Sequence, residues 1–301
     1  MNATAFEKLR SQEREQSVVG MASYIVASEL FAHLADDRDP DFGSCLKAVA
    51  RLGQHCGRWS GAPGVDFMQL PDAQVVRQLF GRSIRAEVRP GGYATIIGEI
   101  STKPVPETAR CYQVELAHVR DGIARAEEEF VANLWKKVVL TLDPSASSWQ
   151  AVVRSPKRNG LLKAIVAGDG LELVAGTIVD RAASKAGLSL TPGQRVEAIE
   201  VAHASFPTAI HHHNLLISQL LQHGPDMSKA KRANSVWDHE LTFTTGPGAT
   251  VRGAPLVLVT SDPLILQAAV EAGTTGRVWS LDEYRTRLES RETLIDAYVK
   301  P

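Results

Sequence analysis

The sequence predicts an α/β protein, in which helices flank a parallel sheet and a large, mainly helical insertion interrupts the sheet-forming domain. From residue 206 onward helical and strand patterns alternate, an order that implies a parallel sheet with right-handed crossovers. Within this part, residues 255–260 form a continuous apolar run typical of a strand covered on both faces. Gly/Pro-rich joints separate mainly helical patterns over 59–205. We therefore expect one domain built from 1–58 and 206–301, with 59–205 inserted.

Composition supports a folded chain and limits its partners. Of 301 residues, 44% are hydrophobic and 22% charged, enough to bury a core. The 33 Lys+Arg residues balance 34 Asp+Glu, which excludes a strongly basic protein that coats nucleic acid indiscriminately. No apolar run reaches the roughly 18 residues of a membrane span, and the charged start does not resemble a secretory signal. We expect a cytoplasmic protein with no membrane partner.

The first 58 residues predict three helices. An exposed amphipathic helix over 4–16 is followed by a short strand-like stretch, Val18–Met21. Ser23 is positioned to cap a second helix that runs to about residue 34. The acidic turn at 36–41 ends it, and a third amphipathic helix covers 42–55. The carboxylates of the turn are expected to be solvated rather than to bind a metal.

The remaining elements follow from helix and strand signals farther along the chain. The clearest helix of the insertion runs from about Thr108 to Leu140. After it, a proline at the start and a glycine at the end predict a helix from Pro207 to Gly224, and another helix begins at Ser228. A strand at 255–260 is followed by a helix from Pro263 to Ala272 and a second strand at 277–279. A capping box formed by Ser280 and Glu283 predicts the terminal helix.

Three acidic residues lie in unusual surroundings. Glu29 sits at the edge of the apolar stripe of the second helix, where it is partly desolvated. Asp238 lies near a helix end, one turn after Asn234 and on the same face. Asp262 directly follows the buried strand, with Thr260 on the same strand face.

Each carboxylate also has a purely structural interpretation. Glu29 could pair with Arg51 or Lys47 at the rim of the core, and Asp238 could be a solvated helix residue. Asp262 precedes Pro263, and aspartate before proline is a favourable N-cap followed by a favoured first helical residue. Taken separately, these three residues do not specify a function.

Taken together, four segments resemble the PIN-domain nuclease family. The resemblance covers about residues 17–56 and 206–287, and it rests on SYIVASEL at 23–30, ANSVWD at 233–238, LVLVTSD at 256–262 and AAVEAG at 268–273, followed by WSLDEY at 279–284. In that family a small parallel sheet gathers acidic residues that hold Mg²⁺ or Mn²⁺ for the hydrolysis of RNA.

The resemblance implies a role for each candidate residue. Glu29, Asp238 and Asp262 would bind the ion and carry catalysis, while Thr260 and Asn234 would orient them or contact substrate. Hard divalent cations prefer oxygen ligands, and converging carboxylates repel one another without an ion. Bacterial domains of this kind often act as toxins or defence effectors. The resemblance therefore predicts a metal-dependent ribonuclease, with Mg²⁺ and Mn²⁺ equally acceptable.

One feature of the family is missing from the sequence. PIN domains open with a short apolar strand that carries an aspartate, whereas only Met1–Thr4 precede the first helix here. The recorded start could be late, the strand could come from elsewhere, or catalysis could be lost. The alternative function is accordingly a catalytically inactive PIN-like module that binds RNA or protein. A third reading is a regulatory protein whose α/β part is only a scaffold.

Basic residues supply the second indication of RNA binding. Such side chains position phosphates without reading bases, although each group could equally be an ordinary solvated face. RNA is the expected partner, and a protein partner or a second copy of the chain is the alternative. The three groups are Lys229, Lys231 and Arg232; Arg154, Lys157, Arg158 and Lys163; and Arg77, Arg82, Arg85 and Arg89.

The histidines and cysteines predict structural roles. Adjacent helical residues point about 100° apart, so His211, His212 and His213 cannot converge on one ion. The chain has three cysteines and no CxxC pair, which indicates reduced, structural thiols rather than a disulfide framework. No P-loop, GxGxxG, HExxH or GxSxG motif supports another class of enzyme.

Overall fold

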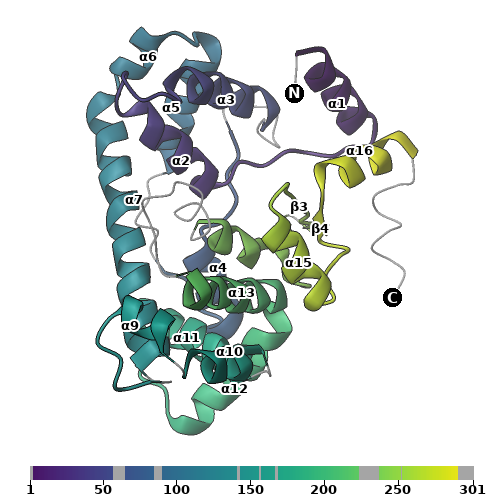
Figure 1. The fold of residues 1–301 in the computed structure, drawn as a ribbon. Coiled ribbons are helices and arrows are strands. Elements are labelled where there is room, and N and C mark those ends of the chain that lie inside the picture. The colour runs from purple at the N-terminus through teal and green to yellow at the C-terminus, as the bar shows by residue number, and fades with distance from the viewer. Residues whose placement is uncertain are drawn as a thin grey trace. The chain divides into compact units, whose positions relative to one another are not determined.

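A computed structural model gives the fold (Figure 1). It describes residues 3–56, 65–84, 90–140, 143–155, 157–166, 169–223, 237–251 and 253–290. Of these residues, 71% are helical and 4% lie in strands. None of the helices in these ranges is long and apolar enough to cross a membrane.

The predicted PIN-like parallel sheet is wrong. The described part of the chain contains two sheets of two short strands each. Strand β1 (Thr250–Val251) pairs with β2 (Ala254–Pro255) antiparallel, and β3 (Leu258–Val259) pairs with β4 (Val278–Trp279) in parallel. The expected strand–helix–strand crossover exists through α15 (Pro263–Glu271), but only on this small scale.

The apolar run at 255–260 fails to form a buried strand for two reasons. Its first residue, Pro255, has no N–H to donate to a ladder, and regular pairing with β4 covers only Leu258 and Val259. Leu256 to Thr260 are only half-buried, whereas a central strand of a parallel sheet is covered on both faces. The strand-like stretch before Ser23 likewise yields only an isolated parallel bridge between Ala22 and Phe67.

The chain divides into two compact units, each formed by separate segments. Unit 1 comprises 1–70, 86–126 and 282–301, and unit 2 comprises 71–85 and 127–281. The two parts of the predicted α/β domain, 1–58 and 206–301, therefore contribute mostly to different units.

Unit 1 is a helical unit whose core forms where α3 packs against α2 and α5. Fully buried Phe31, Leu34, Val49, Ile97 and Ile100 supply its centre, because these helices carry apolar residues at helical spacing. Its helices are α1 (Ala3–Glu15), α2 (Tyr24–Leu34), α3 (Phe42–His55), α5 (Pro90–Thr102), α6 (Pro106–Arg110), the first part of α7 (Gln113–Leu134) and nearly all of α16 (Leu281–Ser290).

A buried carboxylate ties the first helix of unit 1 to its last. Glu13 on α1 is 6% exposed, and its Oε1 accepts a hydrogen bond of 2.6 Å from the Tyr284 hydroxyl of α16. His55 Nδ1 lies 3.4 Å from Glu13 Oε2. Burial raises the pKa of Tyr284, so the phenol stays protonated and remains a donor. The hydroxyl therefore satisfies a carboxylate that would otherwise be costly to bury.

Replacing this hydroxyl tests the contact. We expect Tyr284→Phe to lower the free energy of unfolding by about 1–3 kcal/mol, because a buried acceptor loses its donor. The exposed pair Lys8–Glu289, 2.8 Å apart, offers a control, and Lys8→Gln should cost at most about 1 kcal/mol. Urea denaturation measures both values; equal losses in the two variants would contradict the assignment.

The three cysteines are free, and two of them are buried in unit 1. Burial raises the pKa of Cys45 to about 11, with Asp41 and Asp39 adding to the shift. Burial raises the pKa of Cys56 to about 12, with a further contribution from Glu13. Since the thiolate is the reactive form, both thiols are poor nucleophiles at neutral pH.

Thiol labelling of the native protein tests this difference. At pH 8 we expect one cysteine to react rapidly, because Cys111 is exposed and the other two are shielded and protonated. Cys111→Ser should abolish the rapid phase, and the remaining two thiols should react only after denaturation in urea. A rapid phase that persists in Cys111→Ser would show that a buried thiol is accessible.

Unit 2 is built around α11, which packs against α4, α10, α12 and α13. Alanines on α11–α13 allow these helices to approach closely, while Ile210, Phe206 and Leu221 fill the space between them. Its helices are α4 (Pro71–Phe80), the end of α7, the π-helix η1 (Trp135–Val139), α9 (Trp149–Arg154), α10 (Arg158–Val166), α11 (Asp169–Lys185), α12 (Pro192–Ser205), α13 (Pro207–His223), the 3₁₀ helix η2 (Phe243–Thr245) and α15.

Candidate functional site

Asp262 lies at the start of α15 in unit 2, between the end of β3 and the helix. Its Oδ1 accepts hydrogen bonds from the backbone N–H groups of Leu264 and Ile265, at 2.7 and 3.0 Å. Its own N–H donates to Thr260 Oγ1 at 3.0 Å. The structural interpretation of Asp262 as an N-cap is therefore confirmed. Because both cap bonds use Oδ1, the second carboxylate oxygen is available, and the helix dipole favours its negative charge.

Asp238 lies on a short helical segment, residues 237–242, that is anchored by its neighbours on the same segment. The indole N–H of Trp237 donates to Glu127 Oε1 at 2.8 Å. Glu240 accepts a hydrogen bond from the guanidinium of Arg181. These contacts hold the segment on both sides of Asp238, whose own carboxylate makes no hydrogen bond to a described side chain.

The Asp238 carboxylate is half-buried and close to a like charge. Burial raises the pKa of Asp238 to about 6, and the nearby Asp262 carboxylate raises it further. No described cationic side chain forms an ion pair with either residue. A like charge nearby disfavours ionisation of Asp238, and a bound proton or cation would offset this repulsion.

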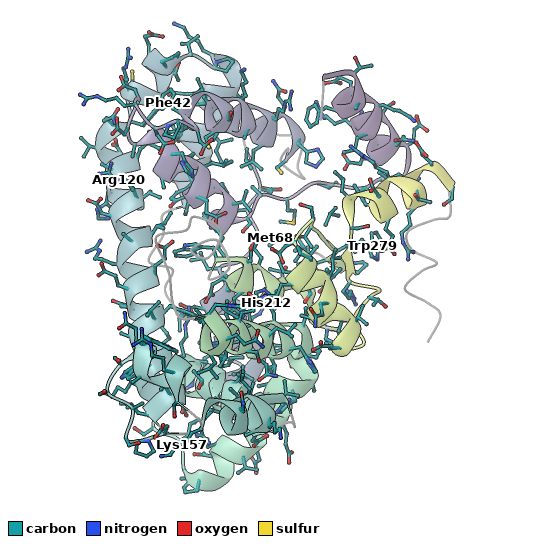
Figure 2. All side chains as sticks on the ribbon, in the orientation of Figure 1. Phe42, Met68, Arg120, Lys157, His212 and Trp279 are labelled. Carbon is teal, nitrogen blue, oxygen red and sulfur yellow. The ribbon has the colours of Figure 1, made fainter. Side chains whose placement is uncertain are left out.

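Three buried histidines of unit 2 contact one another. His213 Nδ1 and His239 Nε2 lie 3.1 Å apart, so one ring donates a hydrogen bond to the other. His212 is fully buried, and neither of its ring nitrogens contacts a hydrogen-bond partner within the described ranges. Its ring lies parallel to that of His239, with centroids 5.8 Å apart (Figure 2 labels His212 on α13).

The charge state of these rings follows from burial. Burial lowers the pKa of His212 to about 4, although Asp262 opposes the shift. Burial lowers the pKa of His213 to about 3, with His212 and Arg181 adding to the effect. All three imidazoles are therefore neutral at pH 7, since the pKa of His239 is also depressed by burial. A neutral imidazole is the form that binds metal ions.

Polar contacts join α13 to α15 and to the turn that follows it. The hydroxyls of Thr208 and Thr274 lie 2.6 Å apart in the interior, and His211 Nδ1 lies 3.5 Å from a Glu271 carboxylate oxygen. Gly273 makes the first contact geometrically feasible: its φ of +68° ends α15 and turns the chain so that Thr274 N–H donates to the Ala269 carbonyl.

The structure brings together some of the sequence-predicted site residues. Asp238, Asp262 and Thr260 belong to unit 2, and the first two lie close enough for their charges to interact. Glu29 lies half-buried on α2 in unit 1. The other candidates, Asn234, Lys229, Lys231 and Arg232, fall outside the described residues.

Most residues of the three basic groups that lie in the described ranges are exposed. Arg77, Arg82, Arg154 and Lys163 are exposed on unit 2, and Lys157 Nζ lies 3.4 Å from Asp143 Oδ1. Arg85 and Arg89 fall outside the described residues, as does the side chain of Arg158.

Sequence reasoning missed His212 and His239. The signal that could have found the first is the inward face of α13, where Thr208, Ala209, His212 and Leu216 follow helical spacing and are buried. His239 comes from a distant segment, so its proximity to α13 has no local sequence signal.

A second group of potential metal ligands lies on unit 1. Ligand atoms of His33, Asp39 and Asp41 all lie within 4.8 Å of one another, the one such group among the described residues. His33 Nδ1 lies 3.1 Å from both Asp39 carboxylate oxygens, and Asp39 Oδ1 accepts the Asp41 N–H at 2.8 Å. These bonds close the turn between α2 and α3 and account for the cluster without an ion.

Comparisons of the chain with protein-family models, with curated proteins and with solved structures find no match. The resemblance to PIN-domain nucleases thus rests on the quoted segments alone and stays a prediction.

The anchoring of the 237–242 segment can be tested through Arg181. Its guanidinium binds Glu240, which is 12% exposed, and lies 2.8 Å from Asp72. We expect Arg181→Met to lower the free energy of unfolding by about 1–3 kcal/mol, because Glu240 loses its charged partner. The more exposed pair Arg195–Asp180 provides a control, and Arg195→Met should cost at most about 1 kcal/mol. Chemical denaturation would contradict the assignment if Arg181→Met proved the milder of the two.

Proposed function

We propose that the chain is a metal-dependent hydrolase of phosphodiester bonds in RNA, with Asp238 and Asp262 holding Mg²⁺ or Mn²⁺. One observation carries the proposal: two carboxylates from separate elements of unit 2 lie close enough for the charge of Asp262 to contribute to the raised pKa of Asp238. Divalent cations prefer such oxygen ligands and remove the repulsion. The proposal does not depend on a PIN-like sheet.

Each residue of the proposed site would have a distinct role. Asp262 keeps Oδ1 on the α15 backbone and leaves its other oxygen to bind, so the helix fixes that ligand. Asp238 lies on the anchored segment and would supply a further oxygen ligand. A bound divalent ion lowers the pKa of a water ligand and stabilises charge on the scissile phosphate. The Thr260 hydroxyl helps to position Asp262, because its oxygen accepts a hydrogen bond from the Asp262 backbone N–H.

RNA is proposed as substrate because exposed basic side chains on unit 2 offer phosphate contacts. Arg77 and Arg82 are exposed, and the predicted contacts Lys229, Lys231 and Arg232 precede Asp238 in the sequence. A role as a cytoplasmic toxin or defence effector comes from the family resemblance alone. A protein partner or a second copy of the chain is the proposed alternative binding partner.

One observation favours the alternative of an inactive module that binds RNA or protein. Asp262 already has a structural function as the cap of α15, which would keep an aspartate at this position without catalysis. The two functions differ in whether RNA is cut.

Cleavage of single-stranded RNA with Mn²⁺ tests the proposal. We expect Asp238→Asn and Asp262→Asn each to reduce the cleavage rate by about 100-fold or more, because each removes a charged ligand worth several kcal/mol of transition-state stabilisation. Asparagine is as good an N-cap as aspartate, so Asp262→Asn should keep α15 intact.

The exposed Glu197 on α12 provides the matched control, since Glu197→Gln removes one negative charge of unit 2 outside the site. Equal cleavage by wild type and both aspartate variants would refute the assignment. RNA binding without cleavage by the wild-type protein would establish the inactive alternative.

A further inference from the structure

We propose that α1 is a releasable arm of unit 1, held against the end of α3 by an ion pair between Glu13 and the protonated ring of His55. Loss of the imidazole proton as the pH rises from 6 to 8 loosens α1, while the rest of unit 1 stays folded. This device is independent of the proposed function, because no residue of the candidate site in unit 2 takes part in it.

The first argument is how little apolar packing holds α1. Phe6, Leu9 and Glu13 are buried at helical spacing, so one position of the inward stripe of α1 is a carboxylate. Neither Phe6 nor Leu9 belongs to the core cluster around α2, α3 and α5. Beside α16 (Figure 1), the exposed pair Lys8–Glu289 adds little, because solvent screens it. The attachment of α1 therefore depends largely on Glu13.

The second argument is the geometry around Glu13. The Tyr284 hydroxyl of α16 donates to Glu13 Oε1 at 2.6 Å, and about one turn later Gln16 Nε2 donates to the Leu288 carbonyl, also at 2.6 Å. These two bonds tie α1 to α16. At the other carboxylate oxygen, His55 Nδ1 lies 3.4 Å from Oε2 and has no hydrogen-bond partner in the described part of the chain. The polar link from Glu13 to α3 therefore depends on the charge of one imidazole.

The third argument is what a proton does at this position. Glu13 is 6% exposed, and a buried carboxylate needs compensating partners. A protonated imidazole places a positive charge at ion-pair distance, whereas a neutral one leaves Glu13 mainly with the Tyr284 hydroxyl. The His55 side chain is 26% exposed, so its ring can exchange protons with solvent, unlike that of fully buried His212 in unit 2. Imidazole is the side chain whose charge ordinarily changes between pH 5 and 8.

Two further titratable groups lie close to this pair, and both stay neutral from pH 6 to 8. Burial raises the pKa of Tyr284 on α16, and the bond to Glu13 raises it further. Burial also raises the pKa of Cys56, the residue after α3, to about 12, with a further contribution from Glu13. The change of charge with pH therefore falls on His55.

Two arginines near the ring oppose its protonation. Arg10 of α1 and Arg51 of α3 lie 6.0 and 5.9 Å from the centroid of the Phe6 ring, which itself lies 5.9 Å from the His55 ring. Arg51 is exposed and Arg10 partly exposed, so solvent screens their charges more than that of buried Glu13. The carboxylate accordingly has the stronger effect on the ring.

Hydrogen exchange of the full-length protein tests the release of α1 directly. After correction for the intrinsic pH dependence of amide exchange, we expect the protection of α1 to fall about tenfold between pH 6 and 8, because a buried carboxylate loses its charged partner. The amides of α5 should keep their protection, which distinguishes release of the arm from global unfolding. An equal loss in both helices, or no loss in α1, would overturn the proposal.

Two substitutions of one residue separate charge from packing. His55→Gln should show at pH 6 the weak protection of α1 that the wild type shows at pH 8, because its side chain is always neutral. His55→Lys keeps a positive charge and should protect α1 at both pH values. His118→Gln is the control, since His118 is exposed on the part of α7 that belongs to unit 1. A pH dependence that survives in His55→Gln would refute His55 as the controlling group.

A titration of the wild type followed by nuclear magnetic resonance needs no substitution. The ring signals of His55 should titrate with the same midpoint as the loss of α1 protection, because one proton controls both. A midpoint outside that transition, or a ring that stays neutral from pH 5 to 8, would show that packing alone holds α1. RNA cleavage enters neither measurement, so failure of this inference and failure of the proposed function are distinguishable.

Discussion

Helix α13 is buried on most of its surface, and this burial sets the arrangement of unit 2. Ten of its 17 residues are buried, and it packs against α9, α10, α11, α12 and α15. Polar groups inside such a helix need partners from other elements. Thr208 finds Thr274, His213 finds His239, and Asn214 donates to a carbonyl of α10. Pairing inside the core thus positions α15 and the 237–242 segment, the two elements that carry the candidate carboxylates.

Sequence patterns predicted α13 and α15 of this unit because their starts are marked by local signals, whereas α9 to α12 were expected only as part of a mainly helical insertion. Pro207 and Pro263 start α13 and α15 as expected, since proline fits the first turn and Asp262 caps the second helix. The sheet could not be predicted in the same way. A strand needs a neighbour supplied by another part of the chain, and the run at 255–260 pairs regularly over only two residues. Its apolar character indicated burial, but residues 256–260 are only partly buried.

Only part of the candidate site could be predicted from the sequence. Asp262 could be found because its cap signal is local, whereas its proximity to Asp238 follows from how α15 and the 237–242 segment pack on α13. Three consecutive helical histidines were not expected to share one ion, because their side chains point in different directions. In the structure, His211 lies beside Glu271 and His213 forms a hydrogen bond with His239. The spacing of these histidines gave no indication that His212 is fully buried with both ring nitrogens unpaired among the described residues, because that depends on elements from elsewhere in the chain.

Unit 2 contains a few polar groups whose surroundings do not satisfy them. Its helix ends are capped, the turn after α15 has the glycine that its backbone needs, and most interior polar groups are paired. Several exceptions gather in one region: the half-buried Asp238 carboxylate beside Asp262, and the unpaired nitrogens of His212 and His239. Each lowers stability, and folded proteins tend to retain such groups where binding or catalysis needs them. The cost therefore points to this region as a site on physical grounds, independently of any resemblance between families.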